Sequence, residues 1–476
     1  MWRRVGLAGG LAEGQARRPS AELRWSRELP QARRPDRLPW VPCRRGSGSP
    51  RRCPATARSW GRCRRRGVRG QPVARHAASD EHAASDERAA SDERAACRAS
   101  HGLARADEPP APPAASAPES KFTLGGYVEA YYSYNFNDPS NGLTNFRAFD
   151  NRHNAITLQN LVADLGWEYD AVYASGAIQF GQVGETYYGA SEPALRGSSG
   201  TSPGGVEVFK HIQKAYLGWG PTKALRLEAG LFTSPIGPES MPTHENWTWS
   251  HSHLFYALPF YHSGVRAGYE LSKQHTVRAG VYNGWNNALD NNAEKSIALE
   301  YNYTPSETEA FATQYFTGVE RPTGALEGRA WRHLLDASLK VKATPFLELL
   351  ADVDGGVEPN RFGTSAWLAG ILAARVKATS WLYLAGRQAM FGEKRAKQGL
   401  DVADPIAIPA SWMSSSTATV DVRPVPHVSA KLEYRHDAAA GDIFYRGAVT
   451  GDGDGTPFEA NARSQDTVTL GLTAWF

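Results

Sequence analysis

Apolar and polar residues alternate with a period of two in many segments between Phe122 and the last residue of the chain, Phe476. In residues 122–136 (FTLGGYVEAYYSYNF) one set of alternate positions is mostly apolar, whereas the other set contains Thr123 and Glu129. Residues 467–476 (TVTLGLTAWF) alternate in the same way. A period of two is the repeat of a β-strand, because successive side chains point to opposite faces of a sheet. The pattern therefore predicts a strand at each end of this region.

Further segments between these two show the same alternation and bring the predicted number of strands to about sixteen, within a range of 14 to 18. Several carry charged residues on the less apolar face, as in ALRLEAGL and SAKLEYR. The fourteen additional segments are 154–169, 171–181, 209–219, 224–232, 263–272, 275–284, 295–303, 308–317, 333–343, 346–355, 365–377, 381–391, 413–423 and 427–436.

The connections between the predicted strands alternate in length. The short connections are 220–223, 272–274, 304–307, 344–345 and 423–426, and the long ones are 137–153, 182–208, 233–262, 392–412 and 437–464. Short turns at one end and long loops at the other are typical of an outer-membrane β-barrel, whose short turns face the periplasm. An even number of strands places both ends of the barrel on the periplasmic side.

A soluble β-sandwich is the main alternative, because its strands also alternate when one sheet face meets the core. Two features favour the membrane barrel. The polar face carries charged residues in many strands, and the apolar face carries aromatic residues near strand ends, as expected at membrane interfaces. These aromatic residues are Tyr134, Phe136, Trp167, Tyr169 and Trp219. The predicted fold is all-β, a transmembrane antiparallel β-barrel over residues 121–476 in the bacterial outer membrane, with outer-membrane lipid as a partner.

Charge divides the chain into two unlike parts. Residues 1–106 hold 24 Arg, no Lys and 10 acidic residues, a net charge of +14. The other 370 residues hold 29 basic and 39 acidic residues, a net charge of −10. The +4 of the whole chain is therefore no evidence that the folded part binds nucleic acid, and no nucleic-acid partner is expected.

Residues 1–106 are predicted to be a disordered Arg-rich extension, because they contain few apolar residues and a tandem repeat (AASDEH, AASDER, AASDER) over 77–94. One interpretation is a basic nucleic-acid-binding arm; the favoured one is translation from an upstream start codon. The extension holds all four cysteines, without a Cys-x-x-Cys pair, so zinc binding is not favoured.

A possible export signal lies at the end of this extension. Ala104-Arg105-Ala106 has the small-x-small form of a signal-peptidase site, but no apolar core precedes it. We therefore hypothesise a remnant cleavage region whose signal peptide was lost to a wrong start or a frame error. Residues 107–120, rich in Pro and Ala, are predicted to be a periplasmic lead into the barrel.

Two segments resemble known outer-membrane proteins. The last strand, with Leu472, Ala474 and Phe476, resembles the signal that the barrel-assembly machinery recognises, which implies this machinery as a partner. The segment 230–270 resembles the OmpL-like β-barrel porins of Gram-negative bacteria. The matching residues are Pro235-Ile236-Gly237, Glu239, Asn246, Ser250, Ser252, Pro259 and Gly264-Val265-Arg266. The resemblance covers roughly residues 122–476 and implies a porin-like channel without defining its solute.

Charged residues on the polar faces of the strands are predicted to line the pore. Both signs are present, so opposing rows could set up a transverse field that orients polar solutes. The net charge of −10 suggests a mild preference for cations. The predicted pore-lining residues are Glu129, Lys214, Arg226, Glu228, Arg266, Arg278, Glu300, Lys340, Lys342, Glu348, Asp352, Lys431, Glu433 and Arg435.

The long connection 233–262 is a candidate constriction loop, by analogy with sixteen-stranded porins in which the third loop folds into the lumen. The analogy would bring inward Glu239, His244, Glu245, Trp247 and Trp249. The alternative is a loop that packs over the rim of the barrel.

Metal binding is not favoured at either candidate position. His251 and His253, with His244 and His262 nearby, could bind a transition metal if they shared a strand face, but loop histidines are more often solvated. Asp452, Asp454 and Glu459 faintly resemble a calcium loop without its full ligand pattern. No metal or cofactor is therefore expected.

The sequence predicts an outer-membrane porin for passive diffusion of small polar solutes or ions, possible as a homo-trimer. A substrate-selective or gated transporter is the first alternative, although residues 107–120 are too short for a plug. An outer-membrane barrel enzyme or a surface-binding barrel is the second. In the predicted strands no outward Ser pairs with an outward His, so no catalytic residues are proposed.

Overall fold

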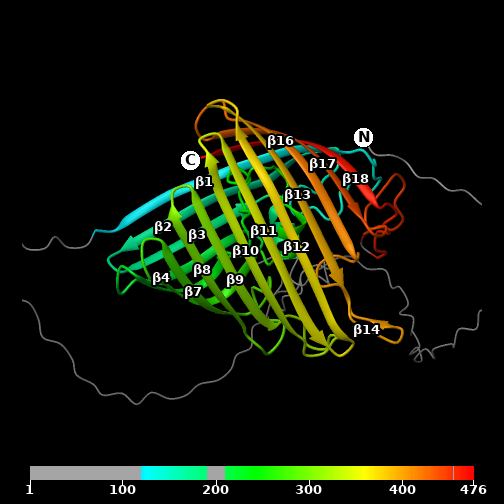
Figure 1. Ribbon diagram of the computed structural model, residues 1–476, viewed down its shortest axis with the longest axis horizontal. Coiled ribbons are helices and arrows are strands. Elements are labelled where there is room, and N and C mark those ends of the chain that lie inside the picture. The colour runs from blue at the N-terminus through cyan, green and yellow to red at the C-terminus, as the bar shows by residue number, and fades with distance from the viewer. Residues whose placement is uncertain (1–118, 190–208, 454) are drawn as a thin grey trace, which may run out of the picture. The chain divides into compact units, whose positions relative to one another are not determined.

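A computed structural model describes residues 119–189, 209–453 and 455–476, and its strands form a closed antiparallel barrel (Figure 1). Sixteen strands make up the barrel, so the predicted fold class and strand number are confirmed. The predictions for residues 1–106 and for nearly all of 107–120 lie outside the described residues.

The sixteen barrel strands follow one another around the wall in chain order. The first eight are β1 (Lys121–Asn135), β2 (Ala155–Tyr169), β3 (Val172–Phe180), β4 (Ile212–Trp219), β5 (Leu225–Thr233), β6 (Tyr261–Glu270), β7 (His275–Tyr282) and β8 (Ser296–Ser306). The other eight are β9 (Glu309–Val319), β10 (Trp331–Thr344), β11 (Leu347–Asn360), β12 (Gly363–Lys377), β13 (Leu382–Lys394), β16 (Trp412–Val422), β17 (Val428–Ala439) and β18 (Ser464–Trp475).

Short elements occupy three of the long connections. They are α1 (Val183–Gly189), α2 (His253–Ala257) and the small hairpin of β14 (Lys397–Gln398) and β15 (Asp401–Val402). No helix in the described ranges is long and apolar enough to cross a membrane.

The barrel closes where the first strand meets the last. β1 pairs with β18 from Tyr127↔Trp475 to Asn135↔Thr467. The backbone N–H of Phe476 donates to the carbonyl of Gly126 at 3.0 Å, and the N–H of Gly126 donates back at 3.2 Å. The beginning of β1 and the end of β18 therefore lie side by side, at the rim of the barrel that carries the short turns.

The largest difference from a predicted strand boundary is at the end of β11. A strand was expected to end at residue 355, whereas β11 continues to Asn360 and β12 begins at Gly363. A side chain at Gly356 would lie 2.1 Å from the Trp367 ring, so this glycine makes room for a ring of the next strand rather than a turn. The hairpin of β11 and β12 is therefore longer and more tightly connected than expected.

The two faces of the barrel wall differ in chemistry. Outward positions carry apolar side chains exposed to the surroundings, such as Leu161, Leu217 and Leu372. Aromatic side chains at strand ends are also exposed, among them Trp219 and Tyr169. Inward positions carry charged and hydroxyl side chains, most of them buried by other parts of the chain. An apolar outer band with aromatic edges is the surface that a bilayer requires.

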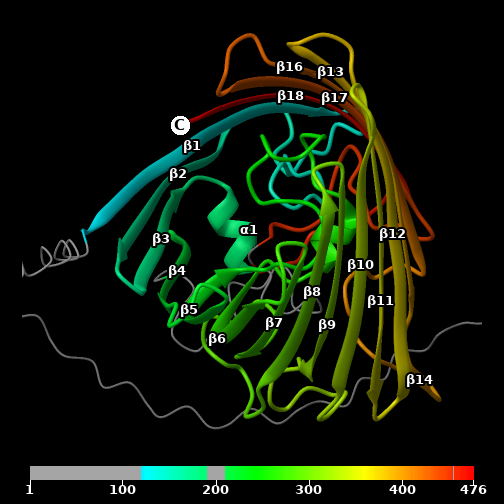
Figure 2. The same ribbon diagram turned by 60° about the vertical axis from the view of Figure 1, so that its left-hand side comes forward.

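The interior of the barrel is occupied by loops that fold inward. Figure 2 shows α1 and the chain between β5 and β6 within the ring of strands. α1 packs Val183, Tyr187 and Tyr188 in an apolar cluster with Phe260 and Tyr261. The interior is therefore structured rather than an empty tube.

Candidate functional site

Residues 234–260, here named the lumen segment, connect β5 to β6 and lie against the inward faces of β1, β13, β16, β17 and β18. The segment turns at Gly237, where φ is 83° and the N–H donates to Asp336 of β10 at 3.3 Å. It ends after α2, a single turn that Ser252 caps by accepting the N–H of Phe255 at 3.1 Å.

Charged side chains of β17 bind the backbone of the lumen segment. Glu433 accepts the N–H of Trp249 at 2.6 Å and that of Ser250 at 3.1 Å. Lys431 donates to the carbonyls of Thr243 and, at 2.6 Å, Asn246. A carboxylate on N–H groups and an ammonium on carbonyls satisfy backbone groups that would otherwise be buried without partners.

Two arginines bind the middle of the segment. Arg387 of β13 pairs with Glu239 at 2.5 Å and also donates to the Ser250 carbonyl at 2.7 Å. Arg435 of β17 donates to the His251 carbonyl at 2.6 Å and pairs with Asp437 at 2.7 Å. Both arginine side chains are buried, so these are hydrogen-bonded ion pairs shielded from water.

His253, at the start of α2, lies within the same network. Its Nε2 is 2.6 Å from Nη2 of Arg435 and 3.2 Å from Oδ1 of Asp437. Burial, reinforced by the charge of Arg435, lowers the pKa of His253 to about 4, so the imidazole is neutral at pH 7. An unprotonated Nε2 can accept the guanidinium N–H.

Glu239 is ionised in the same network. Burial would raise the pKa of this carboxyl, but the Arg387 guanidinium, His251 and the hydrogen bonds from Ser252 hold the pKa below its ordinary value. The segment therefore binds the wall with a fixed negative charge at Glu239 and a neutral imidazole at His253.

Four predicted pore-lining residues do not face open water, which is a correction to the prediction. Glu129, Lys431, Glu433 and Arg435 lie on the inward face, but the lumen segment covers them and each is at most 1% exposed. Glu129 accepts the backbone N–H and the hydroxyl of Thr243, both at 2.6 Å. Alternation identifies the inward face but not which inward residues a loop covers.

Most other predicted pore-lining residues form ion pairs on the inward face. The pairs are Lys214–Asp164 (2.6 Å), Arg266–Glu228 (2.5 Å), Arg278–Glu300 (2.5 Å) and Glu348–Arg375. Arg226 lies over the Tyr173 ring, and Lys340 and Lys342 are exposed in the lumen.

Asp352 differs from these residues because it is buried, at 5% exposed, beside β10 and β12. Its carboxyl group lies beside the carboxyl group of Asp336 on β10.

The five residues predicted for a constriction divide between two environments. Glu239 and Trp249 are buried against the wall, where Trp249 lies 6.2 Å from the ring of Tyr131. His244, Glu245 and Trp247 lie toward the end with the short turns, and His244 stacks on Trp475 at 4.5 Å. The structure thus places the loop inside the barrel, and its role as a constriction remains a prediction.

The packing of Trp249 gives a test of the segment's position. A Cβ at Gly471 of β18 would lie 2.1 Å from the Trp249 ring, so Gly471→Ala must displace the indole. We expect the substitution to weaken docking by about 1–3 kcal/mol, seen as faster hydrogen exchange over residues 234–260. Gly386→Ala is the control, because the nearest atom would lie 4.0 Å away. Equal exchange in the two variants would contradict the packing.

The histidines named as possible metal ligands have separate surroundings. His251 contacts Asn246 and the Ser240 carbonyl, whereas His262 stacks on Tyr282 at 4.7 Å. His251 and His253 do not share a strand face, because Ser252 begins a helix. Among the described residues no group of three His, Cys, Asp or Glu could hold a metal ion.

Of the residues that suggested a calcium loop, Asp454 lies outside the described residues. Asp452 accepts the N–H of Thr456 at 2.7 Å, which is the bond of a local turn.

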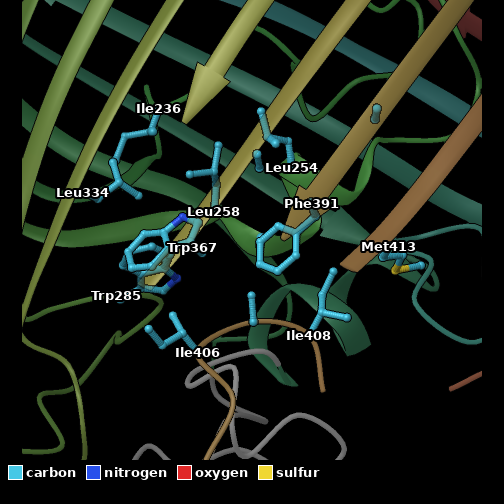
Figure 3. Packing of buried hydrophobic residues seen from close by; sticks show 14 of the residues in the cluster. Ile236, Leu254, Leu258, Trp285, Leu334, Trp367, Phe391, Ile406, Ile408 and Met413 are labelled. Carbon is cyan, nitrogen blue, oxygen red and sulfur yellow. The ribbon is translucent and has the colours of Figure 1, made fainter. Parts of the chain in front are cut away.

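An apolar cluster fills part of the barrel near the long loops (Figure 3). Its residues come from the inward faces of the strands, the lumen segment and three other loops. Those labelled in Figure 3 are Ile236, Leu254, Leu258, Trp285, Leu334, Trp367, Phe391, Ile406, Ile408 and Met413. Apolar side chains inside a barrel exclude water and ions from the space they occupy.

The opposite end of the lumen is open and polar. A cavity of about 750 Å³ lies between the lumen segment and strands β1, β2 and β4. Asp164, Lys214, Glu239 and Glu245 are among the residues that line it. The lumen is therefore charged and accessible at the short-turn end, whereas an apolar cluster fills part of it near the long loops.

Sequence reasoning missed several charged residues of the lumen. Arg387, Arg375 and Asp437 were not among the predicted pore-lining residues. The alternation of the sequence could have identified the two arginines as inward residues. Arg387 is an even number of residues from the inward Tyr383, and Arg375 is an even number of residues from the inward Trp367. Asp437 was missed because the predicted strand ended at residue 436, whereas β17 continues to Ala439.

A closed barrel of sixteen strands with an apolar exterior and a charged lumen defines an outer-membrane porin. The model of the family described as "Putative beta-barrel porin-2, OmpL-like" matches residues 121–476, and the chain belongs to this family. This match confirms the resemblance seen in residues 230–270 and the location in the bacterial outer membrane. No curated protein matches the sequence.

Solved structures with a similar barrel include three bacterial outer-membrane proteins. The channel DcaP of Acinetobacter baumannii is 12% identical, with 75% of this chain and 97% of that chain covered and a TM-score of 0.48. The anion-selective porin of Comamonas acidovorans is 11% identical, with 75% and 100% covered and a TM-score of 0.48. OmpT of Vibrio cholerae is 11% identical, with 75% and 98% covered and a TM-score of 0.47.

Proposed function

We propose that this protein is a porin through which small polar solutes or ions diffuse passively across the outer membrane. The observation that supports the proposal best is the charged inward face, where Arg226, Lys340 and Lys342 remain exposed to the lumen. A barrel of about sixteen strands is wide enough to hold an aqueous channel around such residues.

The test is single-channel recording of the full-length protein in a planar bilayer. We expect stepwise currents that increase linearly with voltage. A folded barrel that shifts on gels after heating but carries no current would contradict the proposal. A wild-type sample left unfolded serves as the control for currents caused by residual detergent.

Gated transport is a second candidate function, favoured by the apolar cluster at the long-loop end. Trp285, Ile406 and Phe444 come from three different loops and meet within the barrel. Such a constriction would pass ions only after one of these loops moves, because apolar narrow regions are poorly wetted. Voltage-independent openings that switch between a closed and an open level would support this function.

We propose no catalytic role. Residues 200–204 have the form Gly-x-Ser-x-Gly and lie outside the described residues. That motif is specific for a hydrolase only where a strand leads through it into a helix, and its predicted position here is a connection between two barrel strands.

The proposed partners are outer-membrane lipid and the barrel-assembly machinery, the latter through the last strand. Leu472 and Phe476 on this strand are exposed on the outward face. A homo-trimer is also proposed, and one structure of Vibrio cholerae OmpT is described as a trimer form. Chemical cross-linking in native membranes would distinguish a trimer from a monomer.

A further inference from the structure

Five basic side chains gather on the inward face at the short-turn end of β10, β12 and β16. We name Lys340, Lys342, Arg375, Lys377 and Arg423 the mouth cluster. Their positions are fixed by strand register, since Lys342 is opposite Glu348, and Glu348 is opposite Arg375 on the next strand. The cluster therefore spans neighbouring parts of the wall, with Glu348 of β11 between Lys342 and Arg375.

Two aromatic rings hold the cations of the mouth cluster in place. Trp247 of the lumen segment lies between Lys340, at 5.5 Å from the ring centre, and Arg375, at 5.2 Å. The Tyr383 ring contacts Arg375 at 5.3 Å and Arg423 at 5.2 Å. A ring contacts a cation without accepting a hydrogen bond from it, so the Lys340 ammonium keeps its N–H groups available.

The mouth cluster has more cations than acidic partners. Glu348 pairs with Arg375, and Asp421 pairs with Arg423 at 2.9 Å. Glu245 of the lumen segment is a third acid, exposed and near enough to Lys340 to interact with it.

Three lysines of the mouth cluster lie outside these two ion pairs. Lys340, Lys342 and Lys377 are exposed, and within the described ranges none of their ammonium groups lies within 4.0 Å of a carboxylate oxygen. The excess of positive charge is opposite in sign to the net −10 of residues 107–476, so the charge of the whole barrel does not describe this mouth.

We propose that the mouth cluster binds small oxyanions, carboxylates or phosphates, as they pass the lumen, with Lys340 and Lys342 as its main ligand-contacting residues. The inference deepens the proposed porin function and rests on it, because a solute would reach these residues from within the lumen. Exposed ammonium groups beside fixed guanidinium groups match the several oxygens of such anions. The protein therefore favours anionic solutes at this mouth.

The test compares the full-length protein with the K340Q/K342Q double variant. Binding of citrate and of inorganic phosphate is measured separately by calorimetry in detergent. We expect wild-type protein to bind at least one of these anions, and the double variant to bind it at least tenfold more weakly. Binding of citrate alone would identify carboxylates as the ligands, and binding of phosphate alone would identify phosphates. Binding of neither, or equal binding in both proteins, would overturn the proposal.

The K223Q/K273Q double variant is the matched control. It also removes two lysines from the short-turn end, but these lie exposed in the turns outside the lumen. We expect its anion binding to equal that of the wild type; an equal loss in the two double variants would show a general effect of charge and overturn the site.

Bilayer recordings separate this proposal from the porin function. In a salt gradient, the wild-type reversal potential should indicate a preference for chloride that decreases in K340Q/K342Q. A barrel without current would contradict the porin function, while calorimetry would still decide whether the mouth cluster binds anions.

Discussion

Replacing Arg435 with Ala is expected to release the lumen segment from the barrel wall and to raise the single-channel conductance severalfold. The guanidinium is fully buried and donates to the His251 carbonyl at 2.6 Å and to Ser250 Oγ at 3.1 Å. Its removal also leaves the buried Asp437 carboxylate without its nearest cation. Removing one partner of a buried ion pair typically costs about 3–5 kcal/mol.

The matched control is Arg463→Ala, which removes an arginine from an exposed pair with Asp442 at 3.3 Å. Exposed pairs contribute about 0–1 kcal/mol, so its conductance and unfolding temperature should equal those of the wild type. Hydrogen exchange over residues 234–260 shows whether the segment has moved. An Arg435→Ala barrel that folds with wild-type exchange and conductance would show that the segment does not depend on this residue. Arg435→Lys, which keeps the charge, tests the same point if the alanine variant fails to fold.

The alternation of apolar and polar residues was sufficient to predict the barrel. Each of the sixteen strands was placed correctly within a few residues, because one face of every strand contacts lipid and the other faces the interior. The prediction was least accurate at β11, which was expected to end at residue 355 and continues to Asn360. In the structure Gly356 accommodates the Trp367 ring, a requirement of the neighbouring strand that no local pattern contains.

The side-chain contacts inside the lumen were much harder to predict from the sequence than the strands. His251 and His253 were treated as residues on one strand face. In the structure Ser252 caps a helix that begins at His253, so the two imidazoles do not share a face. Arg387 meets Glu239 across 148 residues of sequence, and only the docked loop brings the two side chains together. Strand periodicity assigns a residue to a face, whereas burial on that face depends on tertiary contacts between distant parts of the chain.

Acidification from pH 7 to pH 4 is expected to undock the lumen segment and increase the conductance. The docked His253 has a pKa of about 4, below its ordinary value of 6.5. Between these pH values the undocked segment binds a proton that the docked segment does not, so docking weakens as the pH falls. At about 1.4 kcal/mol for each unit of pKa, the loss approaches roughly 3 kcal/mol at pH 4. The wall groups that face the imidazole are Arg435, Asp437 and Arg387.

Protonation of the Glu239 carboxylate also weakens docking, but at a lower pH than protonation of His253. Its pKa is below the ordinary value of 4.5, so its contribution to docking is present above pH 4.5 and is lost as the pH falls through the pKa of the docked form. His253→Gln separates the two groups, because the amide oxygen can still accept from Arg435 but does not titrate. In this variant the rise in conductance between pH 6.5 and 4.5 should be smaller than in the wild type. The part that remains comes from His251 and His244, because burial also lowers their pKa values. The rise below pH 4.5 that comes from Glu239 should be retained. A wild-type conductance that stays constant from pH 7 to pH 4 would show that protonation of His253 does not control docking.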